Sequence, residues 1–155
     1  MFKKLFLCLI LIPTILEANQ LYRNIQMKSG IPIHYYEKEG FPIDNDAVKK
    51  ILGIIDDFAY YAIKGKLNNL EGLMGKNEIK NFKRGIREDG IKTYRKELQE
   101  YYQKIKIISL SVMEKKKNQY FINFDCHFTE ENIDRYKCII TITKEKVYLD
   151  TDTSD

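Results

Sequence analysis

The segment 123–128, NFDCHF, places Asp125, Cys126 and His127 next to one another. These are the residue types that a cysteine nucleophile, its orienting acid and its base require. The surrounding residues alternate between apolar and polar, which is typical of a β-strand, and neighbouring strand residues point to opposite faces. Cys126 is then predicted on the buried face, with Asp125 and His127 on the other face. The three groups cannot converge within this strand, so we assign no catalytic residue here.

The buried cysteine has one candidate partner, Cys138, on the next alternating segment. A one-residue slip of a hairpin here would set core residues against charged ones, and a turn centred on Asn132 avoids this. Opposed residues on antiparallel strands have Cα atoms about 4.5 to 5.5 Å apart, within the range of a disulfide. We therefore predict a Cys126–Cys138 disulfide, with two reduced, buried cysteines as the alternative. The predicted pairs are Phe128 with Tyr136, Cys126 with Cys138, Phe124 with Ile140, and Ile122 with Ile142.

Tyrosine is the abundant residue type that could form a binding site, with 11 tyrosines among 155 residues. Tyr61, Tyr94 and Tyr101 belong to predicted helices, and Phe124 belongs to the predicted sheet. Their rings could line a pocket in which tyrosine hydroxyls orient a ligand. Filling of the core by the same rings is the alternative explanation.

No metal site and no cofactor are predicted. The two histidines and three cysteines do not have the spacing of a zinc site. The segment 72–77, GLMGKN, lacks the glycine spacing and the Ser or Thr of a phosphate-binding loop. The neighbouring acids Asp56 and Asp57 are interpreted as solvated residues on a helix flank.

The period of the apolar residues changes once along the chain. Before Lys104 they recur at three and four positions, which indicates helices, and after it they alternate, which indicates strands. The predicted fold class is α+β, with N-terminal helices packed on one face of a C-terminal antiparallel meander of three to four strands. The predicted helices are 44–65, 67–74, 78–87 and 91–104, and the predicted strands lie around 108–112, 120–128, 136–142 and 147–149.

The other face of this sheet keeps apolar residues among polar ones. A partner, a second copy in a homodimer, or the N-terminal arm is expected to cover part of it. These apolar residues are Ile107, Met113, Phe121, Ile139 and Tyr148.

Residues 1–18 have the layout of a secretory signal. Lys3 and Lys4 precede an apolar run, and Ala18 is a suitable residue before a cut at Asn19. The run is shorter than the roughly 20 residues of a spanning helix. We therefore predict a periplasmic or secreted bacterial protein. An uncleaved membrane anchor is the alternative, because Leu16 stands where a small residue is usual.

The chain is accordingly divided into four parts. These are a signal peptide (1–18), an irregular arm (19–43), a single α+β domain (44–150) and a polar tail (151–155). The formal net charge of +4 comes from 26 basic and 22 acidic residues that interleave along the chain. No nucleic-acid partner is expected, because such proteins carry a basic stripe.

The phrase AIKGKLNNLEGLM, residues 62–74, ends the long first helix in a Lys-Gly-Lys-Leu turn. With the order of elements over 44–149, it resembles the nuclear transport factor 2-like superfamily. The resemblance implies helices that wrap a curved sheet into a cone with a possible pocket. Members of that superfamily include isomerases, dehydratases and non-enzymatic exported proteins, and the catalytic ones place acid, base or histidine side chains inside the cone.

Here the predicted inward positions of the sheet are almost entirely apolar or cysteine. We therefore expect a non-catalytic exported domain that binds an envelope protein or a small apolar ligand, with a toxin-neutralising partner protein as a variant. The alternative is a small cofactor-free enzyme of isomerase or dehydratase type that uses Tyr or Asp side chains in the cone.

Overall fold

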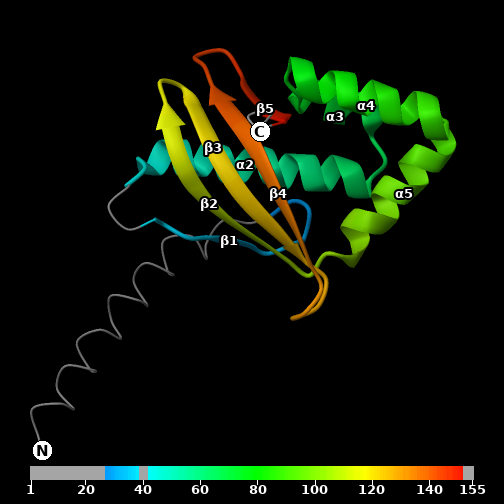
Figure 1. The fold of residues 1–155 in the computed structure, drawn as a ribbon, viewed down its shortest axis with the longest axis horizontal. Helices are drawn as coiled ribbons and strands as arrows, with labels where there is room; N and C mark the ends of the chain where they lie inside the picture. The colour runs from blue at the N-terminus through cyan, green and yellow to red at the C-terminus, as the bar shows by residue number, and fades with distance from the viewer. Residues whose placement is uncertain (1–26, 39–41, 152–155) are drawn as a thin grey trace, which may run out of the picture.

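The computed structural model describes residues 27–38 and 42–151 (Figure 1). The predicted signal peptide, the first part of the arm and most of the polar tail lie outside the described residues. The described chain is α+β, as predicted. Its elements are β1 (Ile33–Tyr35), α2 (Asn45–Ile63), α3 (Leu67–Leu73), α4 (Lys76–Asp89), α5 (Ile91–Lys104), β2 (Ile107–Lys116), β3 (Gln119–His127), β4 (Ile133–Ile142) and β5 (Val147–Thr151).

The described strands form one five-stranded sheet in the order β1-β2-β3-β4-β5. The four C-terminal strands form the predicted antiparallel meander. The predicted count of three to four strands is wrong because β1, from the arm, adds a short parallel strand at the edge of β2. Three residues are too few to show an alternating pattern, so this strand is defined by its pairing with β2.

The arm also contributes to the core. Ile31, Ile33 and Ile43 are buried against the domain. The domain boundary predicted at residue 44 therefore cuts through a packed region.

Helix α2 crosses one face of the sheet (Figure 1). The Asp44 side chain caps its first turn by accepting hydrogen bonds from the backbone N–H groups of Asp46 and Ala47. The apolar stripe of α2 packs on the inward residues of β2, β3 and β4 and forms the main core with them. The helix stops before Gly65, whose φ of 64° suits glycine.

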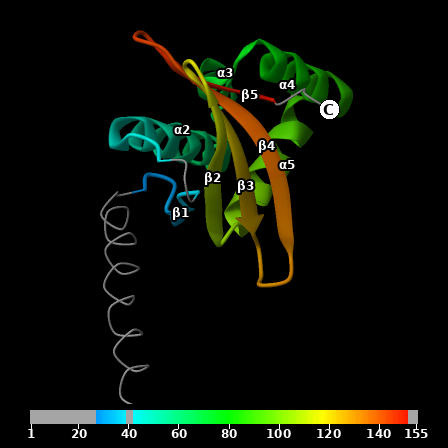
Figure 2. The ribbon, with the colours of Figure 1, turned by 60° about the vertical axis from the view of Figure 1, so that its left-hand side comes forward.

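Helices α4 and α5 form a corner beside the sheet (Figure 1). Gly90, with a φ of 79°, makes the turn between them. A second, smaller core joins this corner to α2 and α3, with Ala62, Leu67, Leu70, Met74 and Phe82 as its buried residues. The corner and the curved sheet, whose bend is visible along β4 in Figure 2, leave a space between them that the site occupies.

The register of β3 with β4 differs from the predicted one. Cys126 lies opposite Asp134, and Cys138 lies opposite Ile122. The predicted opposition of Cys126 to Cys138 is therefore wrong. The structure has no disulfide between them, and both residues are buried. The observed hairpin is centred on Glu130 instead of Asn132, an even displacement that keeps every apolar residue on its face. The alternation therefore excludes a one-residue slip but does not distinguish these two registers.

Candidate functional site

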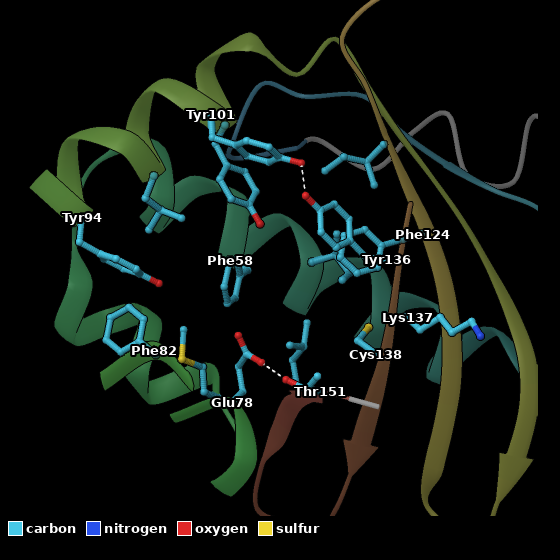
Figure 3. Close-up of a pocket in the computed structure, with 16 residues that line it drawn as sticks. Phe58, Glu78, Phe82, Tyr94, Tyr101, Phe124, Tyr136, Lys137, Cys138 and Thr151 are labelled. Carbon is cyan, nitrogen blue, oxygen red and sulfur yellow. Dashed lines mark hydrogen bonds between the residues drawn. The ribbon is translucent and has the colours of Figure 1, made fainter. Parts of the chain in front are cut away.

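A cavity of about 370 Å³ lies between the helices and the sheet. Helices α2, α4 and α5 supply one wall, and strands β2 to β5 supply the other (Figure 3). Most of its lining is aromatic or aliphatic. The lining residues are Ile55, Phe58, Met74, Glu78, Phe82, Tyr94, Leu98, Tyr101, Tyr102, Ile108, Phe124, Tyr136, Lys137, Cys138, Leu149 and Thr151.

The helical wall is built from aromatic rings. Phe82 and Tyr94 pack edge to face, with ring centroids 5.5 Å apart, and the Tyr94 hydroxyl points into the cavity (Figure 3). Gly85 makes room for this arrangement, because a Cβ atom there would lie 2.6 Å from Cε2 of Tyr94. Phe58 and Tyr102 continue the wall with centroids 6.0 Å apart.

At one end of the cavity, two phenols and a carboxylate form a hydrogen-bonded cluster. The hydroxyl oxygen of Tyr101 lies 2.8 Å from Oδ2 of Asp134 and 2.5 Å from the hydroxyl oxygen of Tyr136. The hydroxyl of Tyr136 is 3.3 Å from the same carboxylate oxygen. The β3–β4 register creates this cluster, because Tyr136 stacks on Phe124, its cross-strand partner, at a centroid distance of 5.2 Å.

Both tyrosine hydroxyl protons of this cluster form hydrogen bonds within the cluster. One hydroxyl proton must lie between the two phenol oxygens at 2.5 Å. The other is best placed on the hydrogen bond from Tyr101 to Asp134, because a carboxylate is the stronger acceptor. The phenol oxygens then offer only lone pairs, and no proton, to a ligand in the cavity. This end of the cavity therefore accepts hydrogen bonds.

The tyrosine hydroxyls of the cavity stay protonated. Burial is the largest cause that raises the pKa of Tyr101, and its hydrogen bonds to Tyr136 and Asp134 raise it further. Burial also raises the pKa of Tyr102, Tyr136 and Tyr94, and the charge of Glu78 adds to the effect on Tyr94. A phenolate is thus disfavoured throughout the site.

Glu78 lies at the other end of the cavity, in the first turn of α4. One of its carboxylate oxygens accepts a hydrogen bond from the Thr151 hydroxyl, and the other is turned to the cavity beside Phe58 (Figure 3). The Asn81 amide donates in turn to the Thr151 oxygen at 3.3 Å. This arrangement fixes the carboxylate but leaves one of its oxygens for a ligand.

Strand β5 holds this end of α4 in place. Gly75 is the N-cap residue and has no side chain, so Asp150 on β5 takes the capping role. Its carboxylate accepts hydrogen bonds from the backbone N–H groups of Glu78 at 2.6 Å and Asn77 at 3.3 Å. The backbone N–H of Gly75 also donates to the carbonyl of Leu149 at 2.6 Å. The position of Glu78 therefore depends on the last strand of the sheet.

Three of the four predicted pocket residues line the cavity: Tyr94, Tyr101 and Phe124. Tyr61 does not, because it packs on the second core and meets the edge of the Tyr60 ring at 5.5 Å. Sequence reasoning missed Glu78 and Tyr136. An acidic residue near the start of a helix, such as Glu78, is common, and so is a tyrosine in an alternating strand, such as Tyr136. The sequence pattern therefore did not mark either residue as part of a site.

The segment 123–128 does not form a catalytic triad. Cys126 is 1% exposed and faces the core, and burial raises the pKa of its thiol to about 12. On the other face His127 Nε2 lies 2.5 Å from Ser109 Oγ, and Asp125 pairs with Arg135 at 3.8 Å. The opposite-face arrangement expected of this strand is therefore what the structure has.

Within residues 27–38 and 42–151, no three His, Cys, Asp or Glu side chains are grouped so as to hold a metal ion. Over the same residues, no helix combines the length and the apolar character that a membrane crossing requires. The chain matches no protein-family model, no curated protein and no solved structure.

Proposed function

We propose that this protein is an exported, non-catalytic domain that binds a small, largely apolar ligand in the cavity between α2, α4, α5 and the sheet. The observation that carries the proposal is the cavity itself. Its volume of about 370 Å³ is within the range of small-molecule sites, and its wall is mainly aromatic and aliphatic with few polar groups. Export is supported by the signal-like segment 1–18.

The resemblance to the nuclear transport factor 2-like superfamily belongs to this proposal. Helices beside a curved antiparallel sheet, with a cavity between them, are the arrangement that the resemblance implies. The fold supports a pocket without indicating a reaction.

Binding can be tested with N-phenyl-1-naphthylamine, a neutral aromatic probe whose fluorescence increases in apolar surroundings. We expect saturable binding to the protein and loss of binding in Leu98→Trp, because the larger ring fills the cavity. Ile91→Trp is the matched control, since Ile91 is on the same helix but is 51% exposed. Equal binding by both variants would show that the probe does not enter this cavity, and no binding to the native protein would refute the proposal.

A second candidate function is a cofactor-free enzyme of isomerase or dehydratase type. The observation that favours it is that a carboxylate oxygen of Glu78 and several tyrosine hydroxyls face one cavity. Glu78 would act as the base that removes a proton next to a substrate carbonyl. Deuterium exchange from D2O into the α-positions of a cyclic ketone, followed by NMR, separates the two functions. An enzyme would exchange these protons faster than its Glu78→Gln variant, whereas a binding protein would show equal rates.

Export is tested on the protein from its native source by cell fractionation and intact mass. A species beginning at Asn19 in the periplasm or medium is expected. A full-length species in the membrane fraction would favour the anchor instead.

A further inference from the structure

We infer that the ligand of this cavity is an organic ammonium ion, an amine cation carried on an apolar body. The inference rests on the proposed binding function and adds the charge of the ligand to it. It comes from the chemistry of the two ends of the cavity and of the wall between them.

The Glu78 end provides a fixed anionic acceptor. The Thr151 hydroxyl orients the carboxylate, and the second oxygen is turned to the cavity (Figure 3). None of the ion pairs in the described part of the chain involves Glu78. A carboxylate in a partly apolar site is stabilised when a cation comes into contact with it.

The cavity that Glu78 lines also has aromatic rings, as cation-binding aromatic cages do. Phe58, Phe82 and Tyr94 line the same cavity as Glu78. The face of an aromatic ring carries partial negative charge and attracts ammonium groups. Rings and a carboxylate together favour a cation over a neutral or anionic group of the same shape.

The opposite end does not reverse this preference. The phenol oxygens of Tyr101 and Tyr136 present lone pairs to the cavity, and the Asp134 carboxylate lies behind them. Lys137 is the only basic residue in the lining, and its ammonium group points away from the cavity (Figure 3). An anionic ligand would therefore meet acceptors and negative charge at both ends of the cavity.

The charge of the ligand can be tested with three probes that share one apolar body: 4-phenylbutylamine, 4-phenylbutan-1-ol and 4-phenylbutanoate. Isothermal titration calorimetry at pH 7 should show the amine binding about tenfold or more tighter than the alcohol. The carboxylate should bind more weakly than both. Equal affinities of amine and alcohol, or a preference for the carboxylate, would overturn the inference and leave apolar ligand binding intact. If none of the three and no naphthylamine probe binds, the proposed function itself fails.

The role of Glu78 is tested with Glu78→Gln, which keeps an oxygen for the Thr151 hydroxyl but removes the charge. The amine should lose its advantage over the alcohol, so that the two affinities agree within about threefold. Glu97→Gln is the matched control, because Glu97 is an exposed acid on α5, and it should retain the full preference. A preference that survives in Glu78→Gln would refute the assigned role of this carboxylate.

A second pair of variants tests the aromatic ring of Tyr94 and leaves the carboxylate of Glu78 in place. Tyr94→Phe keeps an aromatic face and should retain the preference for the amine, whereas Tyr94→Leu should weaken amine binding more than alcohol binding. A parallel loss for both probes in Tyr94→Leu would mean that the ring contributes only shape. These variants keep the inference testable if Glu78→Gln does not fold.

Discussion

Asp56 and Asp57 are neighbours on α2 with opposite environments. Asp56 is 5% exposed and accepts hydrogen bonds from the backbone N–H groups of Lys28 at 2.7 Å and Ser29 at 3.0 Å, and from the Ser29 hydroxyl. Asp57 pairs with the exposed ammonium of Lys28. The interpretation of both acids as solvated is therefore wrong for Asp56, which fixes the arm to the helix.

We expect Asp56→Ala to lower the free energy of unfolding by about 2–4 kcal/mol, because it leaves two N–H donors of the arm without an acceptor. Asp57→Ala should lower it by less than about 1 kcal/mol, as is usual for an exposed ion pair. Urea unfolding of the two variants measures the difference. Similar losses in both would contradict the distinction.

Cys126 is expected to be chemically inert in the folded protein. Its pKa of about 12 leaves almost no thiolate at pH 8, and the side chain is buried. Iodoacetamide at pH 8 should label it slowly in buffer and quickly in urea without a reductant, as read by mass spectrometry of its peptide. A requirement for reductant before labelling would instead indicate a disulfide and a shifted hairpin register.

At the scale of the elements, α4 depends on a cap that comes from another part of the chain. Asp150 on β5 caps its N-terminus, and a Cβ atom at Gly75 would lie 2.6 Å from the Asp150 carboxylate. The helix therefore begins where strand β5 docks on it. Local capping signals alone do not show this dependence.

We expect Gly75→Ala to destabilise the protein by about 1 kcal/mol or more, because the added methyl displaces the capping carboxylate. Gly53→Ala is the matched control: Gly53 is exposed in α2, and apart from its chain neighbours and the backbone of its own helix no atom lies within 4 Å of the new Cβ. It should raise stability by about 0.5–1 kcal/mol through helix propensity. Thermal unfolding followed by circular dichroism measures both changes in stability. Stabilisation by Gly75→Ala would rule out the proposed clash.

The helices and the meander could be predicted because their apolar periods are long and regular. The hairpin register could not, since an even displacement of β4 along β3 keeps Cys138 and Ile140 on the buried face. The observed strands also extend beyond the predicted ones, because β2 runs to Lys116 instead of ending near Val112, and only Lys117 and Asn118 connect it to β3. The polar residues after Val112 do not show where the strand ends.

At the scale of the whole molecule, the cavity is the feature that sequence reasoning anticipated only in part. Helical tyrosines suggested it, and Tyr94 and Tyr101 line it. Tyr136 lies at the cavity because of the register between β3 and β4. Glu78 lies there because β5 docks on the start of α4. Contacts between elements distant in the chain therefore determine the polar ends of the site.

The raised pKa values in and around the cavity predict a loss of stability at alkaline pH. The folded protein keeps protons on Cys126 and on the cavity tyrosines that the unfolded chain releases near their ordinary values of 9.0 and 10.0. This stabilisation is fully present below about pH 9 and is lost as the pH rises toward the folded-state values. The urea midpoint should accordingly be constant from pH 7 to 9 and fall from pH 9 to 11.

Tyr101→Phe should make that alkaline decrease shallower, because one of the shifted groups is removed. Tyr36→Phe is the control, since Tyr36 is 57% exposed and should leave the profile unchanged. A native profile without any alkaline decrease would show that the cavity hydroxyls are not protected.

The parallel pairing of β1 with β2 also sets an order in which the chain can fold. Ile33 and its partner Ile108 are far apart in sequence, so closing this pair costs more chain entropy than the hairpins of the meander. We therefore expect the arm to dock last, after β2 has been synthesised and paired. Strand β1 can therefore join the sheet only after residues 108–110 have been synthesised.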